Sequence, residues 1–338
     1  MLTVAIAGAT GAVGGEFLSI LAERRFPVGR FIPLASKRSV GRSVPFGGED
    51  HPVRDLASFD FRGVDVAFFS AGAERSRDHG PRAAKAGALV VDNSSAFRLD
   101  PAVPLIVPEI NLEDAKGHHG LISNPNCSTI LLVMALAPLM RHAAVRRIVV
   151  STYQAVSGAG AKGLTELAQQ LVDDQEGTNL AVSVFPVPIA SNVIPFVQAF
   201  SDGGLTTEEW KMVKETRRIL SAPALRVSAT CVRVPVRRAH SEAVNVEFER
   251  PVSPEEARAW LAAAPGVRVV DDPASMKFPT PRDAEGKDEV LVGRIRRDPG
   301  LETALDLWVT GDQLRKGAAL NAVQIAEALT AAPASARR

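Results

Sequence analysis

The segment Ser123-Asn124-Pro125-Asn126-Cys127-Ser128-Thr129 places one of the two cysteines of this chain at a turn that leads into a long apolar run. Residues 128–140 are rich in Leu, Ile, Val, Met and Ala, which predicts a helix buried on most sides. Because proline is disfavoured inside a helix, the helix should begin at or just after Asn126, with Asn126 as its N-cap and Cys127 in its first turn.

Cys127 is a candidate nucleophile at that position. The unpaired N–H groups and the positive dipole end of a helix N-terminus lower the pKa of a thiol, and the thiolate is the reactive form. The same N–H groups can stabilise the oxyanion that forms when the sulfur attacks a carbonyl. The alternative is a small buried side chain, the commonest fate of a free cysteine. This segment alone leaves both interpretations open.

Composition limits the class of protein. The chain has 338 residues, 46% hydrophobic and 23% charged, as expected for a globular protein of two domains. A formal net charge of +1 gives no electrostatic reason to expect a nucleic-acid or membrane partner. Two cysteines cannot form a disulfide framework, and the longest apolar run, residues 130–140, is too short to span a bilayer. We therefore expect a cytoplasmic protein without a leader, with a frayed tail from Ala331.

The N-terminus has the pattern of a dinucleotide-binding fold. Residues 2–7 predict a buried strand, Gly8-Ala9-Thr10-Gly11-Ala12-Val13-Gly14 a turn, and residues 15–24 a helix. Glycines in this context let the backbone approach a pyrophosphate, which the helix N-terminus attracts. The alternative is a tight strand–helix turn that binds no ligand.

The second strand, predicted at residues 30–35, indicates which cofactor the fold takes. An NAD-binding protein usually has an acidic residue at its end, but this chain has Ser36-Lys37-Arg38-Ser39. Two cations and two hydroxyls suit the 2′-phosphate of NADP. The alternative is a solvated basic loop.

Residues 64–70 and 88–92 predict further buried parallel strands, with a helix at 80–86 between them. The polar cluster that follows, residues 92–98, lies at a carboxyl strand end, where open α/β sheets bind ligands. Arg98 could hold an anion there or be an ordinary surface arginine.

A second glycine cluster opens the second half of the chain. Residues 147–152 predict a strand, and Gln154 follows near the start of a loop, where its amide could orient a substrate. Ser157-Gly158-Ala159-Gly160 then precedes a helical pattern at residues 162–173.

Another helix is expected at residues 208–220, with Thr207 as its N-cap and Glu208 and Glu209 in its first turn. Acidic residues at that position also suit the helix dipole, so Glu208 need have no other role.

Alternation predicts an antiparallel hairpin of residues 225–236 and 244–248, with the valines packed and Arg233 on the other face. His240 falls in the connection. A loop histidine is usually exposed, but near a cysteine nucleophile it would be the natural acid/base. A strand at 304–309 and a helix at 314–329 end the chain, and this helix could return to the first domain.

Taken together, these motifs resemble the aspartate-semialdehyde dehydrogenase family over nearly the whole chain. The resemblance rests on the Gly8 to Gly14 loop, Ser95-Ala96-Phe97-Arg98, Asn124 to Thr129, Thr152 to Gly158, Glu208-Glu209-Trp210-Lys211, Arg233-Val234-Pro235-Val236 with His240, and Lys316-Gly317-Ala318-Ala319-Leu320-Asn321. The cysteine motif is the most specific of them.

The resemblance implies a fold and an activity. The fold is α/β: a Rossmann-type NADP-binding domain at 1–127, completed by the C-terminal helix at 312–330, and an α+β catalytic and dimerisation domain at 128–311. The reaction is the reversible NADPH-dependent reduction of L-aspartyl 4-phosphate to L-aspartate 4-semialdehyde and phosphate. The chain is expected to be a homodimer or a dimer of dimers that binds a small-molecule substrate and phosphate.

The resemblance also implies residue roles. Cys127 corresponds to the nucleophile that forms an acyl-thioester, and His240 to the general acid/base. Matched by motif, Gln154, Glu208 and Arg233 bind substrate, Arg98 and Lys211 bind phosphate, and Thr10, Gly11, Ala12, Val13, Arg38, Ser39, Ser157, Gly158 and Asn321 bind the cofactor.

Two other interpretations remain. A relative acting on another acyl-phosphate, such as N-acetylglutamyl phosphate, keeps the nucleotide fold but has a different cysteine motif. A non-catalytic homologue that binds nucleotide or a partner should have lost Cys127, Arg233 or His240, and all three are present.

Overall fold

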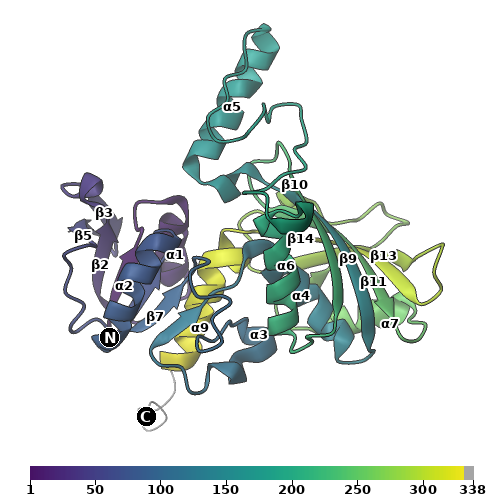
Figure 1. The fold of residues 1–338 in the computed structure, drawn as a ribbon, viewed down its shortest axis with the longest axis horizontal. Helices are drawn as coiled ribbons and strands as arrows, with labels where there is room; N and C mark the ends of the chain where they lie inside the picture. Colours follow the sequence, from purple (N-terminus) through teal and green to yellow (C-terminus); the bar gives the residue numbers. More distant parts are fainter. Residues whose placement is uncertain (331–338) are drawn as a thin grey trace. The chain divides into compact units, whose positions relative to one another are not determined.

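A computed structural model describes residues 1–330, which divide between two compact units (Figure 1). The first unit is Met1–Asn126 together with residues 318–330, and the second is Cys127–Gly317. The frayed tail expected from Ala331 lies outside the described residues. Within residues 1–330, no helix is both long and apolar enough to cross a membrane.

The first unit contains β1 (Leu2–Ala7), α1 (Ala12–Glu23), β2 (Val28–Ala35), a helical turn at Lys37–Ser39, β3 (Ser43–Phe46), β4 (Glu49–Pro52), β5 (Arg54–Asp55), β6 (Val66–Phe69), α2 (Ala73–Lys85), β7 (Leu89–Asp92), α3 (Pro108–Asn111), a turn at Leu112–Ala115, β8 (Leu121–Ser123) and α9 (Leu320–Thr330).

The second unit contains α4 (Cys127–Met140), β9 (Val145–Gln154), a turn at Val156–Ala159, α5 (Ala161–Glu176), a turn at Asp202–Gly204, α6 (Thr207–Ile219), β10 (Arg226–Arg233), β11 (His240–Phe248), α7 (Pro254–Ala262), β12 (Val267–Val269), α8 (Pro281–Ala284), β13 (Val290–Arg297) and β14 (Ala304–Gly311). A π-helical turn at Arg315–Ala319 spans the boundary between the units.

The first unit is a parallel sheet covered by helices on both faces. The strand order is β5-β2-β1-β6-β7-β8, and every pair is parallel. Val4 and Ile6 of β1 pack with α1 and α9 on one face, whereas Ala5 and Ala7 pack with α2 on the other. Buried apolar strands of this kind form the doubly wound fold. The last helix therefore belongs to the first unit, which confirms that expectation.

Two helices of the first unit differ from the sequence prediction. α1 begins at Ala12, directly after the glycine turn, rather than at residue 15. α2 begins at Ala73 rather than at residue 80 and has Pro81 inside it. Its polar first turns lack an apolar period, and the buried Ser76 and Ala83 show that tertiary packing holds the helix where its local pattern is weak.

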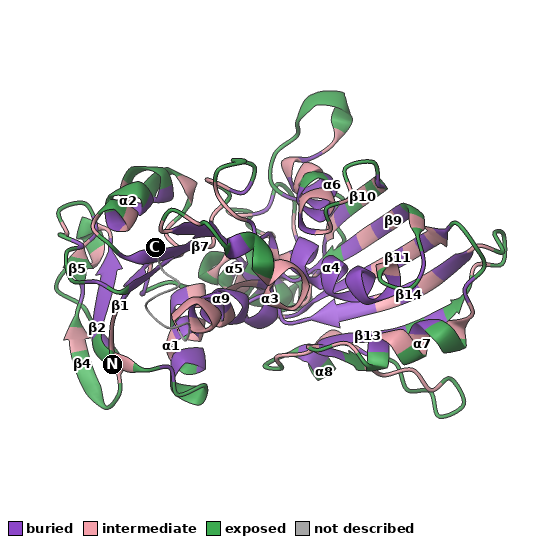
Figure 2. Ribbon diagram, turned by 90° about the horizontal axis from the view of Figure 1, so that it is seen from below, coloured by how far each residue is buried: buried purple, intermediate pink, exposed green. Residues whose placement is uncertain are grey.

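The second unit is a mixed sheet with helices on one face. The strand order is β10-β9-β11-β14-β13-β12. α4 packs on β11, β13 and β14, while α6 packs on β10 and α7 on β12 and β13. α4 is buried along nearly its whole length (Figure 2), and it begins at Cys127, as its sequence predicts.

The predicted hairpin of the second unit is wrong. β10 and β11 do not pair with each other: β9 lies between them, parallel to β10 and antiparallel to β11. The face assignment is also reversed, because Cys231 and Arg233 lie on the buried side and Val232 is only half-buried. Both errors have one cause. Alternation shows that two faces differ but does not show which face the helices cover or which strand pairs with which.

Three local boundaries also need correction. Gln154 is the last residue of β9, not part of the following loop. α6 is capped by Thr206 rather than Thr207, in a capping box with Glu209. The last helix begins at Leu320, after the π-helical turn, and not at residue 314.

Glu242 is an unusual residue of this sheet. It lies on β11, opposite Thr152 of β9, on the helix-covered face, and it has no solvent exposure. Neither carboxyl oxygen has a hydrogen-bond partner among the described residues. Burial raises the pKa of Glu242 well above its ordinary value, so the neutral acid is the favoured form.

We predict that Glu242→Gln stabilises the protein increasingly as the pH rises. Because the pKa of Glu242 is raised in the folded state, the stability that its protonated form contributes is fully present below the unfolded pKa of about 4.3. That stability is lost as the pH rises through the folded pKa. Urea unfolding at one protein concentration should show that the free energy of unfolding of the variant exceeds that of the wild type by more at pH 8 than at pH 5. Glu247→Gln, at a half-buried position on the same strand, should show no such widening. The same difference in free energy of unfolding between Glu242→Gln and the wild type at both pH values would contradict the prediction.

Candidate active site

Three polar side chains form one row across the sheet of the second unit. Arg233 of β10 is the pairing partner of Gln154, the last residue of β9. On the other side Ser241 pairs with Tyr153, which places His240 level with Gln154. All three side chains lie on the face that the helices cover. The register of three neighbouring strands therefore brings together residues that are up to 86 positions apart.

Cys127 is at the first turn of α4, which packs on this same face. Gly311, the partner of His240 on β14, allows the contact, because a Cβ there would lie 2.5 Å from Cδ2 of Leu131 in α4. Gly317 allows a similar close contact beside the cysteine, because a Cβ added to it would lie only 3.1 Å from Cβ of Cys127. Glycine at both places lets α4 approach the row closely.

The backbone N–H and carbonyl of Ala155 orient His240 and Arg233 of the row. The N–H of Ala155 donates to Nδ1 of His240 at 3.0 Å, and its carbonyl accepts from Nη1 of Arg233 at 2.7 Å. The sequence prediction missed this residue, because a main-chain contact leaves no signal in the type of side chain.

The contact to Nδ1 decides the form of the His240 ring. A backbone N–H can only donate, so Nδ1 accepts and the neutral ring carries its proton on Nε2. Burial, followed by the nearby charge of Arg233, lowers the pKa of His240 well below its ordinary value. The ring is thus neutral near pH 7 and presents an Nε2–H group.

Arg233 is a buried cation that faces the cysteine. It is 8% exposed, and burial lowers the pKa of its guanidinium, while charges on Cys127 and Glu208 act in the opposite direction. A Cβ added to Gly158 would lie 2.9 Å from Nη1 of Arg233 and 3.3 Å from Nε2 of His240. Gly158 therefore leaves room for the ends of both side chains.

A hydrogen-bond chain continues from Gln154 toward solvent. Nε2 of Gln154 donates to Oγ of Ser128, next to the cysteine, and to Oε1 of Glu208. Oε2 of Glu208 accepts from Nζ of Lys211 at 3.2 Å. Glu208 is buried, so its role extends beyond the helix dipole: it holds both an amide and an ammonium group.

The two cysteines have different environments. Cys231 is fully buried, and burial raises the pKa of its thiol, which favours the unreactive form. Cys127 is partly accessible at a helix N-terminus. The environment therefore favours Cys127 as the nucleophile.

The glycine loop of the first unit is shaped for close backbone approach. Gly8 has φ of +93°, and a Cβ there would lie 2.4 Å from the carbonyl oxygen of Ser70. A Cβ at Gly14 would lie 2.5 Å from two carbonyl oxygens of the same loop. Ala12 and Val13 form the first turn of α1, where N–H groups have no partner within the helix. This cradle fits a pyrophosphate.

The basic turn at Lys37–Ser39 lies at the same sheet edge. The N–H groups of Gly8 and Ala9 both donate to Leu34 in β2, the strand that the turn follows. Arg38 is exposed and Ser39 half-buried. The two segments that a dinucleotide needs are therefore neighbours within one unit.

Arg98 and Asn321 are held by other groups of the first unit. Arg98 is buried and donates from Nε to the carbonyl of Asn124 and from Nη2 to that of Asn93. Nδ2 of Asn321 donates to Oδ1 of Asn124 and to the carbonyl of Ile106. Asn321 thus ties α9 to the end of β8, whatever else it binds.

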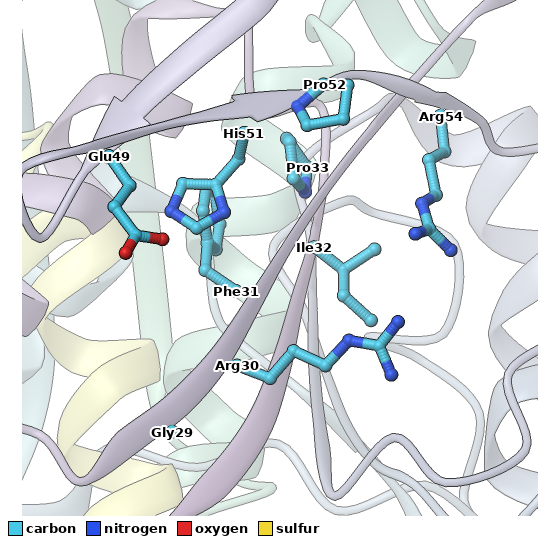
Figure 3. A pocket seen from close by; sticks show the side chains of 9 residues that line it. All are labelled: Gly29, Arg30, Phe31, Ile32, Pro33, Glu49, His51, Pro52 and Arg54. Carbon is cyan, nitrogen blue, oxygen red and sulfur yellow. The ribbon is translucent and has the colours of Figure 1, made fainter.

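A separate pocket of about 250 Å³ lies along β2, from Gly29 to Pro33 (Figure 3). Arg30 and Arg54 line one side of it, and Glu49 and His51 the other. No residue from Gly8 to Gly14 lines this pocket. The pocket is therefore not the dinucleotide cradle. Among residues 1–330, no cluster of three or more His, Cys, Asp or Glu could hold a metal ion.

Known proteins match this chain over nearly its full length. Residues 3–118 match the family described as semialdehyde dehydrogenase, NAD binding domain, and residues 136–316 match semialdehyde dehydrogenase, dimerisation domain. The aspartate-semialdehyde dehydrogenase of Aquifex aeolicus (strain VF5) is 51% identical over 330 residues, 96% of this chain and 97% of its own.

Two solved structures add bound molecules. Aspartate semialdehyde dehydrogenase II from Vibrio cholerae, complexed with ASA, is 45% identical with a TM-score of 0.94, and 98% of each chain is covered. Aspartate semialdehyde dehydrogenase with NADP from Candida albicans is 26% identical with a TM-score of 0.76, covering 98% of this chain and 99% of its own.

We predict that Gly158→Ala lowers turnover without lowering stability much. The added methyl group would displace the end of Arg233 and crowd the His240 ring, but it meets no backbone atom at these distances. A misplaced group at a reacting centre can cost about 10²-fold in rate. Steady-state kinetics and thermal unfolding test this. The control is Ala159→Gly, because Gly160 has a positive φ and an alanine there would be strained. Wild-type turnover in Gly158→Ala would contradict the packing argument.

Proposed function

This chain belongs to the semialdehyde dehydrogenase family, and its relatives over nearly the full length include aspartate-semialdehyde dehydrogenases. We propose that it catalyses the reaction of these relatives on the row of Gln154, Arg233 and His240 beside Cys127. The reaction is the reversible reduction of L-aspartyl 4-phosphate to L-aspartate 4-semialdehyde and phosphate. It belongs to the biosynthesis of lysine, diaminopimelate, methionine, threonine and isoleucine. That row is the observation that supports the proposal.

Cys127 forms the covalent intermediate. Its thiolate attacks the acyl carbon, a C–S bond forms, and the C–O bond to phosphate breaks, with the electron pair and a proton ending on the released phosphate. The resulting thioester splits a difficult displacement into two easier steps. NADPH, when bound, supplies the hydride that reduces the acyl group. The aldehyde then leaves as the C–S bond breaks and the thiolate is restored.

His240 and Arg233 act on the substrate from neighbouring strands. The Nε2–H group of neutral His240 donates to the oxyanion that forms on the carbonyl, and this side chain carries the acid/base role. The planar guanidinium of Arg233 takes the α-carboxylate in a bidentate contact, and Gln154 and Glu208 complete the substrate site. Arg98 and Lys211 bind the phosphate.

The first unit binds NADP. The cradle at Gly8, Gly11 and Gly14 and the N-terminus of α1 suit the pyrophosphate, through the residues Thr10 to Val13. Arg38 and Ser39 hold the 2′-phosphate. We assign Ser157, Gly158 and Asn321 to the cofactor as well.

We also infer the assembly and the compartment. Residues 136–316 match a dimerisation domain, and the face of the sheet opposite the helices has Tyr153, 36% exposed, and Trp308 with ring centroids 5.3 Å apart. This face supports a homodimer, and a dimer of dimers would be two such pairs. Two free cysteines suit the reducing cytoplasm.

The experiment that tests the function is phosphate-dependent reduction of NADP by the purified protein with L-aspartate 4-semialdehyde. N-acetylglutamate 5-semialdehyde in place of the substrate should give little or no rate. A higher rate with the acetylated substrate would assign the chain to the other acyl-phosphate chemistry, and no rate with either would remove the catalytic proposal.

We predict that Cys127→Ser nearly abolishes turnover and leaves NADP binding intact. A hydroxyl has a far higher pKa than a thiol and would not form the acyl-enzyme at neutral pH. Rates and NADP titration test this, and iodoacetamide should label Cys127 in the wild type. Cys231→Ala is the matched control and should keep most of the activity, because that thiol is buried. Activity in Cys127→Ser with labelling at Cys231 would show that the mechanism is wrong.

We predict that His240→Asn lowers kcat by about 10²-fold, the usual scale for losing a general acid/base. Because the pKa of His240 is lowered, the neutral ring persists as pH falls below about 6.5, so the acid limb of the wild-type pH–rate profile should lie below that value. The variant should lack this limb. His142→Asn, at an exposed position, should leave the profile unchanged. A limb centred near 6.5 that survives in His240→Asn would assign it to another group.

We predict that NADP is preferred over NAD by at least about tenfold in kcat/KM, because a charge-assisted contact is worth about 1.5–3 kcal/mol. Arg38→Ala should erode most of that preference by harming the use of NADP while sparing NAD. Arg30→Ala, at the far end of β2, is the control and should keep the preference. Equal use of both cofactors by the wild type would indicate that the basic turn is only a solvated loop that does not bind the 2′-phosphate.

A further inference from the structure

The main chain immediately before His240 is held in an uncommon conformation. Ala239 has φ of +70°, in the left-handed region, and is fully buried. A residue with a Cβ rarely adopts this region unless its surroundings impose it. Something in the fold must therefore hold this peptide, since the direction of the next side chain depends on it.

Gln313 makes the contact that holds it. Oε1 of Gln313 accepts from the N–H of Ala239 at 2.8 Å, and Nε2 donates to Oγ of Ser157. Gln313 is 2% exposed, so its amide serves these buried groups rather than water. One side chain thus joins the segment that precedes His240 to the segment that contains Ser157 and Gly158.

Gln313 is itself fixed by its neighbours. It follows β14, whose last residue, Gly311, pairs with His240. The preceding Asp312 is buried and accepts from Nε of Arg238 at 2.7 Å and from the N–H of Gly286 at 2.7 Å. The amide of Gln313 therefore projects from a rigid support, as a group that positions another must.

We propose that Gln313 is a positioning residue that holds Ala239 in its left-handed conformation and so aims the ring of His240 at the reacting carbonyl. The ring then has two supports: the N–H of Ala155 on its Nδ1, and the main chain fixed by Gln313. The proposal rests on the assigned role of His240.

Without the acceptor on Gln313, Ala239 can relax to a negative φ, which turns His240 away. Gln313→Met keeps the length of the side chain but removes both polar groups. We expect kcat to fall by about 10- to 100-fold, the scale of a small displacement at the reacting centre, with KM for the semialdehyde changed by less than about threefold. Gln313→Glu keeps an acceptor for Ala239 and should lose less than the methionine variant.

A glycine at position 239 separates positioning from general structural damage. Glycine adopts positive φ about as readily as negative φ, so it needs Gln313 less than alanine does. The loss of kcat caused by Gln313→Met should therefore be several-fold smaller in an Ala239→Gly background than in the wild type. Equal losses in the two backgrounds would overturn the proposal, even if Gln313→Met also lowers the melting temperature.

A second cycle, with His240→Asn, tests whether Gln313 acts through His240. If Gln313 acts through His240, Gln313→Met should lower kcat in the wild type but cause little further loss in His240→Asn. Full additivity of the two losses contradicts the proposal for Gln313 and leaves the role of His240 intact. Wild-type activity in His240→Asn itself would instead contradict the role of His240, and this proposal with it.

Discussion

The insertion of β9 between β10 and β11 is the constraint on which the second unit depends. Parallel pairing on one side and antiparallel pairing on the other bring Gln154, Arg233 and His240 to the same level. Because side chains alternate along a strand, a slip of one residue in either pairing would turn a member of the row to the opposite face. The register of the backbone hydrogen bonds between these strands therefore determines which side chains lie together in the row.

Main-chain groups orient the polar side chains in this buried place. A charged or polar group away from water is costly unless its partners are fixed. Ala155 donates its N–H to His240 and accepts from Arg233 with its carbonyl, so the backbone of one residue fixes the position of both side chains. The lowered pKa of His240 follows from burial and from Arg233, and it keeps a neutral ring near a cation.

The two units rely on different kinds of structure. In the first unit, Gly8 to Gly11 form a local turn that leads into α1, and the groups that suit a pyrophosphate are backbone N–H groups at a helix end. In the second, the candidate groups are side chains that strand pairing brings together from distant parts of the chain. The glycine cradle thus arises from the seven consecutive residues Gly8 to Gly14, whereas the row of Gln154, Arg233 and His240 needs three paired strands.

The sequence by itself determined the features that depend on neighbouring residues. The apolar strand before Gly8, the basic turn at Arg38 and the start of α4 at Cys127 follow from local composition, glycine spacing and the effect of Pro125. Only the tertiary structure decided that β9 separates β10 from β11, that Arg233 lies on the buried face, and how Ala155 and Gln313 contact their partners. The reason is physical. Periodicity and capping act over one or two turns of chain, but strand pairing and burial depend on hydrogen bonds and packing between segments far apart, which no local pattern encodes.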